Sequence, residues 1–589
     1  MVTDCLLIGF NESNFESYVD MVRSMGEDSG AFRDLNLAFV EHEGKPLHAL
    51  DALSAFSANK SAGDVPYHNT DFLWPTLTYL GSHLHRHGHS FDYVNLFHLE
   101  KELLREKLLN DDILTVAITT TLYVSIHPIL EIIQFIREHN QTTRIIVGGP
   151  YISNQCNSEN MSSVAQVFEY MDADYYVISS EGETALAGIL SCLKNGGDWN
   201  QIDNIAFKQN GTYVVTQRLI ESNALEENMV DYSLFPAAVH GELVTLRTAK
   251  SCPFSCAFCG FPQRAGKYKY LAVDLVEQEL DAIREIGGIT TLTFIDDTFN
   301  VPKGRFKDLL RMMIRNDYGF RWNSFYRSDH GDEETIELMA AAGCEGVFIG
   351  AESGCDAILE KMNKTARKKD YLKAIPLLMQ AGITTHCNLI IGYPGETEET
   401  VAETVEFIEL AAPDYFRAQC WYCDPVTPIW ESRDEYGITG SSFNWSHKTM
   451  DSATACGIVD DLFCGIRNST WLPQNGFEMW SLFYLNRKGM SRAQIKRFLT
   501  AFNQGIKDRL NGRSAGELLP ETLRELQAAS QFEPSPTHDL HARCGGSAEA
   551  YRLKEDPLTG SGAASPAATG GASGIAAMTL EEFDLLDDE

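Results

Sequence analysis

Hydrophobic and polar residues alternate along the chain in two series of strand-like and helix-like segments. In the first series, short apolar runs at residues 6–9, 113–121 and 144–149 are separated by amphipathic stretches such as residues 127–140. Continuous apolar strands between helices are typical of a parallel sheet that is covered on both faces. The pattern therefore predicts a doubly wound, Rossmann-like α/β domain over residues 1–230, in which ligands bind beyond the carboxyl ends of the strands.

The alternation starts again after residue 240 and continues for six strand–helix units. The expected strands are residues 243–247, 291–295, 321–326, 346–350, 385–391 and 415–421. Such a series predicts a partial (β/α)6 barrel over residues 240–430, with its chemistry at the carboxyl ends of the strands.

The rest of the chain follows a different pattern. Residues 431–553 are expected to be mainly helical. Residues 554–589 begin with a Gly-, Ala-, Ser- and Pro-rich stretch and end in acidic residues, which predicts a flexible linker and an acidic tail. A disordered tail is the expected state, and a short docking peptide is the alternative.

Composition narrows the possible partners. The chain has 589 residues, 44% hydrophobic and 22% charged, which is ordinary for a globular protein, and no run of 18 apolar residues. Its net charge of −34 repels nucleic acid phosphates but leaves room for a small anion in a local basic pocket. Residues 1–10 read as a first strand, and the 14 cysteines without a secretion signal favour a reducing cytoplasm. We therefore expect a cytoplasmic protein that acts on a small molecule, without nucleic acid or membrane.

Three cysteines carry the clearest chemical signal, in the segment Cys252-Pro-Phe-Ser-Cys256-Ala-Phe-Cys259. Three thiolates can hold three irons of a [4Fe–4S] cluster and leave the fourth iron open. The loop follows the first barrel strand and so lies at the functional rim. A zinc site is the alternative, but zinc needs a fourth ligand. The CxxC pair Cys420 and Cys423 has the usual spacing for zinc but follows a different strand.

The cysteine spacing, with an aromatic residue before the last cysteine, resembles the signature of radical S-adenosylmethionine (SAM) enzymes. The resemblance implies that the open iron binds SAM and that the reduced cluster cleaves it to methionine and a 5′-deoxyadenosyl radical. It places Phe258 and Gly392 near the adenine, Asp296 near the amino group and Glu352 at the ribose. In the simpler interpretation, an acid or glycine at a strand end only makes a turn or caps a helix.

The N-terminal region resembles cobalamin-binding modules in residues 75–89, in the strand 144–149 with Pro150, and in Glu181-Gly182-Glu183. The resemblance implies that Gly148, Gly149 and Glu181 contact cobalamin. The D-x-H-x-x-G motif, which supplies a histidine to cobalt, is absent. Cobalamin would therefore be bound without a lower histidine ligand, or not at all.

Four histidines form a dense patch, at positions 83, 85, 87 and 89. Alternate spacing at the end of a helix scatters side chains over several faces. We expect solvated histidines rather than metal ligands.

A finer resemblance, to the PhpK family, rests on residues 64–75, 116–121 and 419–425. That family includes the cobalamin-dependent P-methyltransferase of phosphinothricin-type antibiotic biosynthesis. The resemblance implies methylation of an N-acetylated phosphinate amino acid of the N-acetyldemethylphosphinothricin type. It also implies a [4Fe–4S] cluster, SAM and methylcobalamin as cofactors, and an external electron donor such as flavodoxin or ferredoxin.

An anionic substrate of this kind needs cations, and Arg247, Arg327 and Arg417 each lie near the end of a barrel strand. Arginine suits bidentate binding of oxyanions, although internal salt bridges with the many acids are the alternative.

Two other functions remain open. The PhpK family is close to peptide epimerases, which convert L- to D-residues in ribosomal peptides and need a hydrogen donor. Cys423 would face inward with Arg417 if the strand alternation continued, or it is simply a small buried residue. The third possibility is a non-catalytic iron–sulfur or corrinoid-binding protein.

Overall fold

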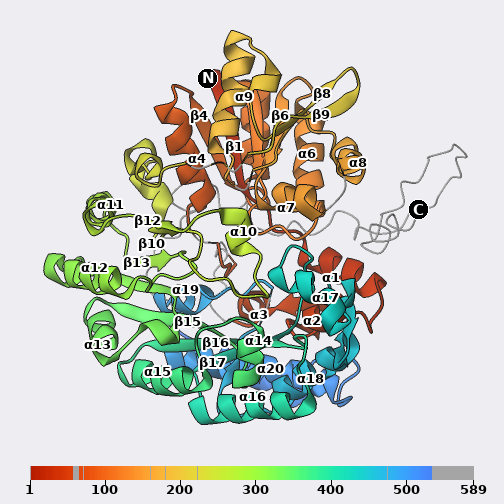
Figure 1. Cartoon of the computed structure of the whole chain (residues 1–589), viewed down its shortest axis with the longest axis vertical. Coiled ribbons are helices and arrows are strands. Elements are labelled where there is room, and N and C mark those ends of the chain that lie inside the picture. Colours follow the sequence, from red (N-terminus) through yellow and green to blue (C-terminus); the bar gives the residue numbers. More distant parts are fainter. Residues whose placement is uncertain are drawn as a thin grey trace, which may run out of the picture.

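The computed structural model describes residues 2–57, 66–70, 72–158, 161–179, 181–219, 221, 223–473 and 475–533. It contains two seven-stranded sheets, one in each region for which the sequence predicts a parallel sheet (Figure 1). The expected linker and acidic tail lie outside the described residues, as do positions 64, 65 and 71 of the segment 64–75. No helix in the described part of the chain is long and apolar enough to cross a lipid bilayer.

The N-terminal sheet has the strand order β4-β1-β5-β6-β7-β8-β9. The first five strands in this order are parallel, and β8 and β9 add an antiparallel hairpin at one edge. The strands are β1 (Val2–Phe10), β4 (Phe91–Leu96), β5 (Asp112–Thr119), β6 (Arg144–Gly148), β7 (Tyr175–Val177), β8 (Ile205–Gln209) and β9 (Thr212–Val215). The chain order reverses between β1 and β5, and ligands of open α/β sheets bind at such a point, beyond the carboxyl ends.

Helices cover both faces of this sheet, which confirms the doubly wound prediction. Leu104 of α5, Ile132 of α6 and Val164 of α8 pack on one face, and Leu77 of α4 and Ile189 of α9 pack on the other. The helices are α4 (Pro75–Arg86), α5 (Lys101–Asn110), α6 (His127–His139), α7 (Pro150–Ser158), α8 (Met161–Met171) and α9 (Glu183–Asn195).

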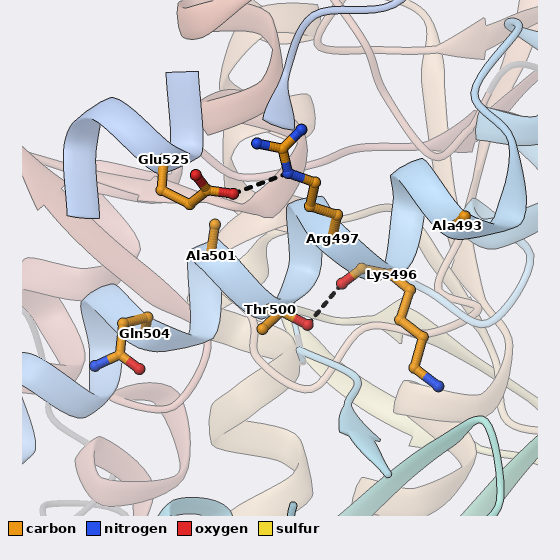
Figure 2. Close-up of a pocket in the computed structure, with 7 residues that line it drawn as sticks. All are labelled: Ala493, Lys496, Arg497, Thr500, Ala501, Gln504 and Glu525. Atoms are coloured by element: carbon orange, nitrogen blue, oxygen red, sulfur yellow. Dashed lines mark hydrogen bonds and ion pairs between the residues drawn. The ribbon is translucent and has the colours of Figure 1, made fainter. Parts of the chain in front are cut away.

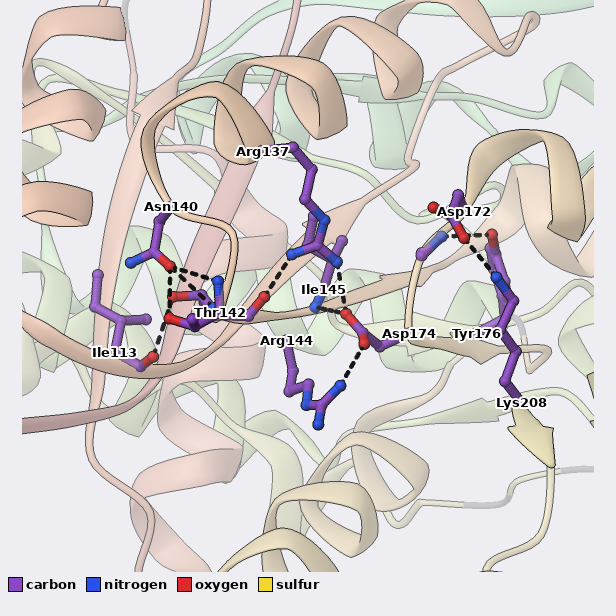
Figure 3. Close-up of polar contacts among 12 residues, drawn as sticks. Ile113, Arg137, Asn140, Thr142, Arg144, Ile145, Asp172, Asp174, Tyr176 and Lys208 are labelled. Atoms are coloured by element: carbon purple, nitrogen blue, oxygen red, sulfur yellow. Dashed lines mark hydrogen bonds and ion pairs between the residues drawn. The ribbon is translucent and has the colours of Figure 1, made fainter. Parts of the chain in front are cut away.

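Asp174, directly before β7, ties the amino-terminal edge of the sheet together. Its carboxylate accepts hydrogen bonds from Arg137 at 2.7 Å, from Arg144 at 2.9 Å and from the backbone N–H of Ile145 at 2.9 Å (Figure 3). Burial favours a higher pKa for Asp174, but these donors hold its pKa below the usual value. This edge is opposite the carboxyl ends of the strands, so the network stabilises the domain away from any ligand.

The second sheet has the order β10-β13-β14-β15-β16-β17-β21, and all of its strands are parallel. Six of the strands match the predicted ones, and the seventh, β21, is too short for a pattern to reveal. The strands are β10 (Leu243–Leu246), β13 (Thr291–Phe294), β14 (Arg321–Phe325), β15 (Cys344–Glu352), β16 (Thr384–Ile391), β17 (Tyr415–Cys420) and β21 (Thr470–Trp471). The helices between them are α11 (Val273–Ile286), α12 (Lys303–Asn316), α13 (Glu333–Ala341), α14 (Asp356–Lys361), α15 (Lys368–Gln380), α16 (Glu398–Ala411) and α18 (Ser452–Gly465).

The region after β17 is less purely helical than the sequence predicts. A small antiparallel sheet precedes α18, and helices α19, α20 and α21 follow β21. The elements are α17 (Arg433–Tyr436), β18 (Thr439–Ser441), β19 (Asn444–His447), β20 (Met450–Asp451), α19 (Ser481–Arg487), α20 (Arg492–Leu510) and α21 (Pro520–Ala529).

A segment inserted after β1 packs on the barrel half of the molecule. It comprises α1 (Phe15–Ser24), α2 (Gly30–Leu35), β2 (Phe39–His42), β3 (Lys45–His48) and α3 (Ala49–Phe56). Of these elements, α2 lies beside α18 (Figure 1). Arg33 forms an ion pair with Asp460 of α18 at 2.6 Å, and Arg509 of α20 donates to the carbonyl of Asn36. Part of the region expected as the N-terminal domain therefore covers the C-terminal half.

Candidate functional site

The three predicted cluster cysteines lie on one loop, after the short strand β11 (Ala249–Lys250) and before α10 (Phe261–Ala265). Figure 1 shows α10 between the two sheets. The N–H of Ala257 donates to the carbonyl of Met362 at 2.8 Å, and its carbonyl accepts from the N–H of Ile429 at 2.9 Å. Asn363 Nδ2 donates to the carbonyl of Ser255 at 2.8 Å. The loop is thus fastened to the segments that follow β15 and β17.

The donor set fits an iron–sulfur cluster. Cys252, Cys256 and Cys259 are free thiols, and the N–H of Phe261 lies 3.5 Å from Cys259 Sγ. Burial raises the pKa of Cys252, and raises that of Cys259 to about 11. Three cysteines from one loop would each bind one iron of a [4Fe–4S] cluster and leave the fourth iron without a protein ligand.

The other CxxC pair points elsewhere. Cys420, the last residue of β17, lies against Cys456 of α18, and Cys423 Sγ lies 3.8 Å from the carbonyl of Gly440 in β18. Burial raises the pKa of Cys423 to about 12. The described residues contain no group of three His, Cys, Asp or Glu side chains placed to hold a single metal ion. β17 ends at Cys420, so the strand alternation on which an inward Cys423 depended does not reach it, and a role as hydrogen donor stays a prediction.

Asp296 and Asp297 follow β13 and have different surroundings. Asp296 is 2% exposed, and its carboxylate accepts from the N–H groups of Thr248 at 2.7 Å and Ala249 at 2.9 Å, and from the Thr248 hydroxyl. Asp297 is exposed and interacts electrostatically with the thiols of Cys252 and Cys259. The Asp296 carboxylate thus fixes the backbone just before the cysteine loop, and Asp297 lies near the cysteines. A contact between Asp296 and the SAM amino group stays a prediction.

Glu352 ends β15 in an unusual backbone conformation. The pairing with β16 shifts by one residue between Gly350 and Glu352, and Glu352 has a φ of +67°. A bulge can re-aim a side chain, and a positive φ outside glycine is costly and is often found at functional sites. The Glu352 carboxylate lies 3.3 Å from Lys364 Nζ, which lies 5.7 Å from the Phe258 ring centre. The expected SAM contacts Glu352 and Phe258 thus lie at the same part of the rim.

Gly392 has a packing reason to be glycine. Its φ is +89°, and a Cβ at this position would lie 2.6 Å from the Trp445 ring. Its N–H donates to Glu396 Oε2 at 2.6 Å, and burial raises the pKa of Glu396 to about 7. A contact between Gly392 and adenine stays a prediction.

Two of the three candidate arginines are engaged by the protein itself. The Arg327 guanidinium lies 3.6 Å from the Phe254 ring centre, forms an ion pair with Asp329 at 3.1 Å and donates to Thr365. Arg247 lies over the ring of Tyr79 of α4. Arg327 therefore supports the cysteine loop instead of offering a free cation, because an aspartate two residues away neutralises it.

The carboxyl edge of the N-terminal sheet contacts the cysteine loop. Glu181, expected at cobalamin, forms an ion pair with Lys250, whose side chain is buried, and the Glu181 side chain is 11% exposed. Gly148 ends β6 and Gly149 follows it, and a Cβ on Gly149, at a φ of +118°, would lie 2.9 Å from Thr120 Oγ1. The Gly149 backbone is therefore packed closely against Thr120. The Glu181 carboxylate is paired with Lys250, which precedes Cys252 by two residues.

The expectation of four solvated histidines is correct for only two. His85 and His87 are exposed, whereas His83 and His89 are each 5% exposed. His83 Nδ1 lies 2.7 Å from Asn228 Oδ1, and His89 Nε2 lies 3.1 Å from Ser191 Oγ. The end of α4 is buried under later segments that a helical pattern alone does not reveal.

A hollow of about 160 Å³ adjoins the cysteine loop. Phe258 lines it together with Ile390, Gln419 and Asp34, so it lies where the loop meets β16, β17 and α2. A larger hollow of about 440 Å³ lies between α20 and α21, where Arg497 pairs with Glu525 (Figure 2). No residue of the barrel rim lines this second hollow, so its size alone does not mark it as the site.

Arg417 lies on the face of β17 that carries Gln419, and its side chain makes no hydrogen bond to a described residue, as is also true of Arg247. The Nε of Arg417 is buried without a partner among those residues. The sequence reasoning missed its neighbours His386 and Asn388 on β16, which also carry unpartnered buried atoms. A signal existed, since polar residues occupy alternate positions in the otherwise apolar strand.

The fold and the loop together define a class. Residues 246–408 match the Radical SAM superfamily, so the predicted radical SAM domain is confirmed within the predicted barrel. The structure is similar to that of the radical SAM methyltransferase TsrM from Kitasatospora setae with cobalamin and a [4Fe–4S] cluster bound. The TM-score is 0.56 at 18% identity, covering 80% of this chain and 98% of that one. This likeness confirms the α/β architecture.

Two sequence relatives extend the comparison. An uncharacterized methyltransferase from Pyrococcus horikoshii is 25% identical over 59% of this chain and 74% of its own length. The anaerobic magnesium-protoporphyrin IX monomethyl ester cyclase of Rubrivivax gelatinosus is 23% identical over 58% of this chain and 63% of its own. The chain thus spans less than two thirds of the second relative, and the two relatives differ in named activity.

Proposed function

We propose that the protein is a cobalamin-dependent radical SAM methyltransferase that replaces P–H by P–CH3 on a phosphinate amino acid. The observation that carries the proposal is the place of the cysteine loop between the carboxyl ends of the parallel strands of the two sheets. Lys250, at the start of this loop, is paired with Glu181 of the N-terminal domain. One open iron would therefore face a space that both domains border, as a reaction with two cofactors requires.

The residues at each edge suit their expected groups. The three cysteines would hold the cluster, and Glu352, Asp297 and the Phe258 ring would border SAM. At the other edge, Trp74 Nε1 is buried without a partner among the described residues, and Gly148 and Gly149 would border the corrinoid. When bound, the cluster with SAM would supply the 5′-deoxyadenosyl radical and cobalamin would supply the methyl group.

The protein's own part is to bind, orient and exclude water. In the balanced reaction, two SAM and two electrons from an external donor convert P–H to P–CH3. The products are S-adenosylhomocysteine, methionine and 5′-deoxyadenosine, which carries the hydrogen from phosphorus. Arg417 would bind an oxyanion of the substrate inside the barrel.

The test uses reduced, cluster-loaded protein with SAM, methylcobalamin and an N-acetylated phosphinate that carries deuterium on phosphorus. We expect S-adenosylhomocysteine and 5′-deoxyadenosine in similar amounts, with deuterium in the 5′-deoxyadenosine. Cys252→Ala protein should not cleave SAM. Deuterium from solvent appearing in a peptide substrate would point to epimerisation instead. If methyl transfer proceeds without 5′-deoxyadenosine, the radical part of the proposal is wrong.

A further inference from the structure

The inner face of the barrel carries polar groups that have no hydrogen-bond partner in the part of the chain that the structure describes. On β16, Cys387, Leu389 and Ile391 are buried in the hydrophobic core, so His386 and Asn388 point to the opposite, inner face. His386 lies edge-on to Phe348 of β15, its partner in the strand register, at 5.7 Å between ring centres. The inner face therefore combines apolar and polar side chains.

Arg417 lies directly beside Asn388 in this lumen. The two residues are register partners in β17 and β16 and project to the same side, while Cys420 of β17 contacts α18 on the other side. Arg417 interacts with Asp34 and Glu478 through space but makes no hydrogen bond to either. Burial lowers the pKa of Arg417 to about 10. A half-buried guanidinium without a hydrogen-bonded anion is costly, and an anionic ligand would relieve this cost.

The neighbouring atoms complete the pattern. His386 is 4% exposed, and neither of its ring nitrogens has a partner. Burial, together with the charge of Arg417, lowers the pKa of His386 to about 3, so the ring is neutral. Asn388 Oδ1 is an acceptor without a donor. The row thus offers one cationic donor, one neutral imidazole and one amide acceptor.

His386, Asn388 and Arg417 lie nearer the amino ends of their strands than the hollow beside Phe258. Ile390 and Gln419, which line that hollow, follow Asn388 and Arg417 by two residues on the same face. Two residues of a strand span roughly 7 Å. A ligand group held by Arg417 would therefore leave the rest of the molecule in the hollow against the cysteine loop.

We propose that Arg417, Asn388 and His386 form an anchoring subsite for the carboxylate and the neighbouring N–H of an amino acid substrate. The carboxylate binds Arg417, the N–H donates to Asn388 Oδ1, and the side chain extends toward the cysteine loop. This inference rests on the proposed function for the identity of the reacting group, but not for the anchor. The subsite would therefore select the substrate by its α-carboxylate and N–H groups, which do not take part in the reaction.

The anchoring subsite can be tested by measuring ligand binding under conditions in which the enzyme does not turn over. Cluster- and cobalamin-loaded protein, unreduced and with SAM, is titrated calorimetrically with N-acetyl-L-glutamate, whose γ-carboxylate replaces the phosphinate. Its α-carboxamide is the matched probe. We expect the wild type to bind the α-carboxamide at least about tenfold more weakly. Arg417→Gln should bind the α-carboxylate roughly 10²-fold more weakly and lose the preference, because a charge partner is removed. Arg417→Lys should bind the α-carboxylate with an affinity between those of the wild type and Arg417→Gln.

Arg315→Gln on α12, where an exposed arginine pairs with Glu277, serves as a control and should leave both affinities unchanged. Equal binding of the two probes by the wild type would overturn the subsite, whatever the variants do. So would an unchanged preference in Arg417→Gln. A preserved α-carboxylate preference with no methylated phosphinate in the turnover assay would instead reject the proposed function and leave the anchor standing.

Discussion

Removing the carboxylate of Asp296 should loosen the start of the cysteine loop. The carboxylate accepts two backbone N–H bonds, from Thr248 and Ala249, and one hydroxyl bond from Thr248, in a position that is 2% exposed. Hydrogen bonds to a charged acceptor contribute about 1.5–3 kcal/mol each. In Asp296→Ala both N–H groups lose their acceptor, so the two backbone bonds together account for roughly 3–6 kcal/mol of local stability.

Hydrogen–deuterium exchange measures this directly. An opening free energy lower by that amount speeds exchange of the Thr248 and Ala249 amides by roughly 10²–10⁴. The matched control is Asp297→Ala, because Asp297 is exposed and makes no bond to these amides. We expect Asp297→Ala to keep wild-type exchange and iron content but to weaken SAM binding. Wild-type exchange in Asp296→Ala, or equal exchange in both variants, would refute the reasoning.

Three further predictions concern stability and the alternative function. Asp174→Asn should lower urea stability by about 1–3 kcal/mol, against less than about 1 for exposed Asp172→Asn. Since the folded pKa of Asp174 is lowered, the Asp174 difference is present above about pH 5 and disappears as pH falls below about 4. Lys250→Met should lower the free energy of unfolding by about 3–5 kcal/mol, because it leaves the Glu181 charge unpaired. Adding Glu181→Leu should restore much of this stability, and a double variant as unstable as Lys250→Met would contradict the ion pair. Cys423→Ala should keep full turnover, and its loss would revive Cys423 as a hydrogen donor.

Much of the fold could be predicted because its strands are buried on both faces. The apolar runs at residues 91–96 and 385–391 coincide with β4 and, to one residue, with β16. The inserted segment 15–56 could not be placed, because its apolar residues look the same whether they pack on the first sheet or the second. Its location is shown by tertiary contacts, such as those of Arg33 and Arg509.

The site could be predicted where its chemistry depends on the spacing of residues along the chain, but not where it depends on the direction in which a side chain points. The three cluster cysteines lie on a single loop, so their spacing in the sequence is enough to predict the cluster site. Asp296 and Asp297 differ by one position at a strand end, where alternation no longer decides which side chain faces the cysteines. The pairing of Arg327 could have been predicted, because Asp329 follows it by two residues and lies within ion-pair distance.

The overall charge of the chain and the charge of its lumen lead to opposite expectations, and the lumen is the better guide to the substrate. The net charge of −34 disfavours anionic polymers at the surface, where each charge is screened by water and salt. Inside the barrel, Arg417 is desolvated, so its field acts over a short range and with little screening. Asp34 and Glu478 partly offset this field, and the Nε of Arg417, which has no partner among the described residues, lies beside Asn388. An acidic protein can therefore select a small carboxylate, provided that the ligand reaches this guanidinium.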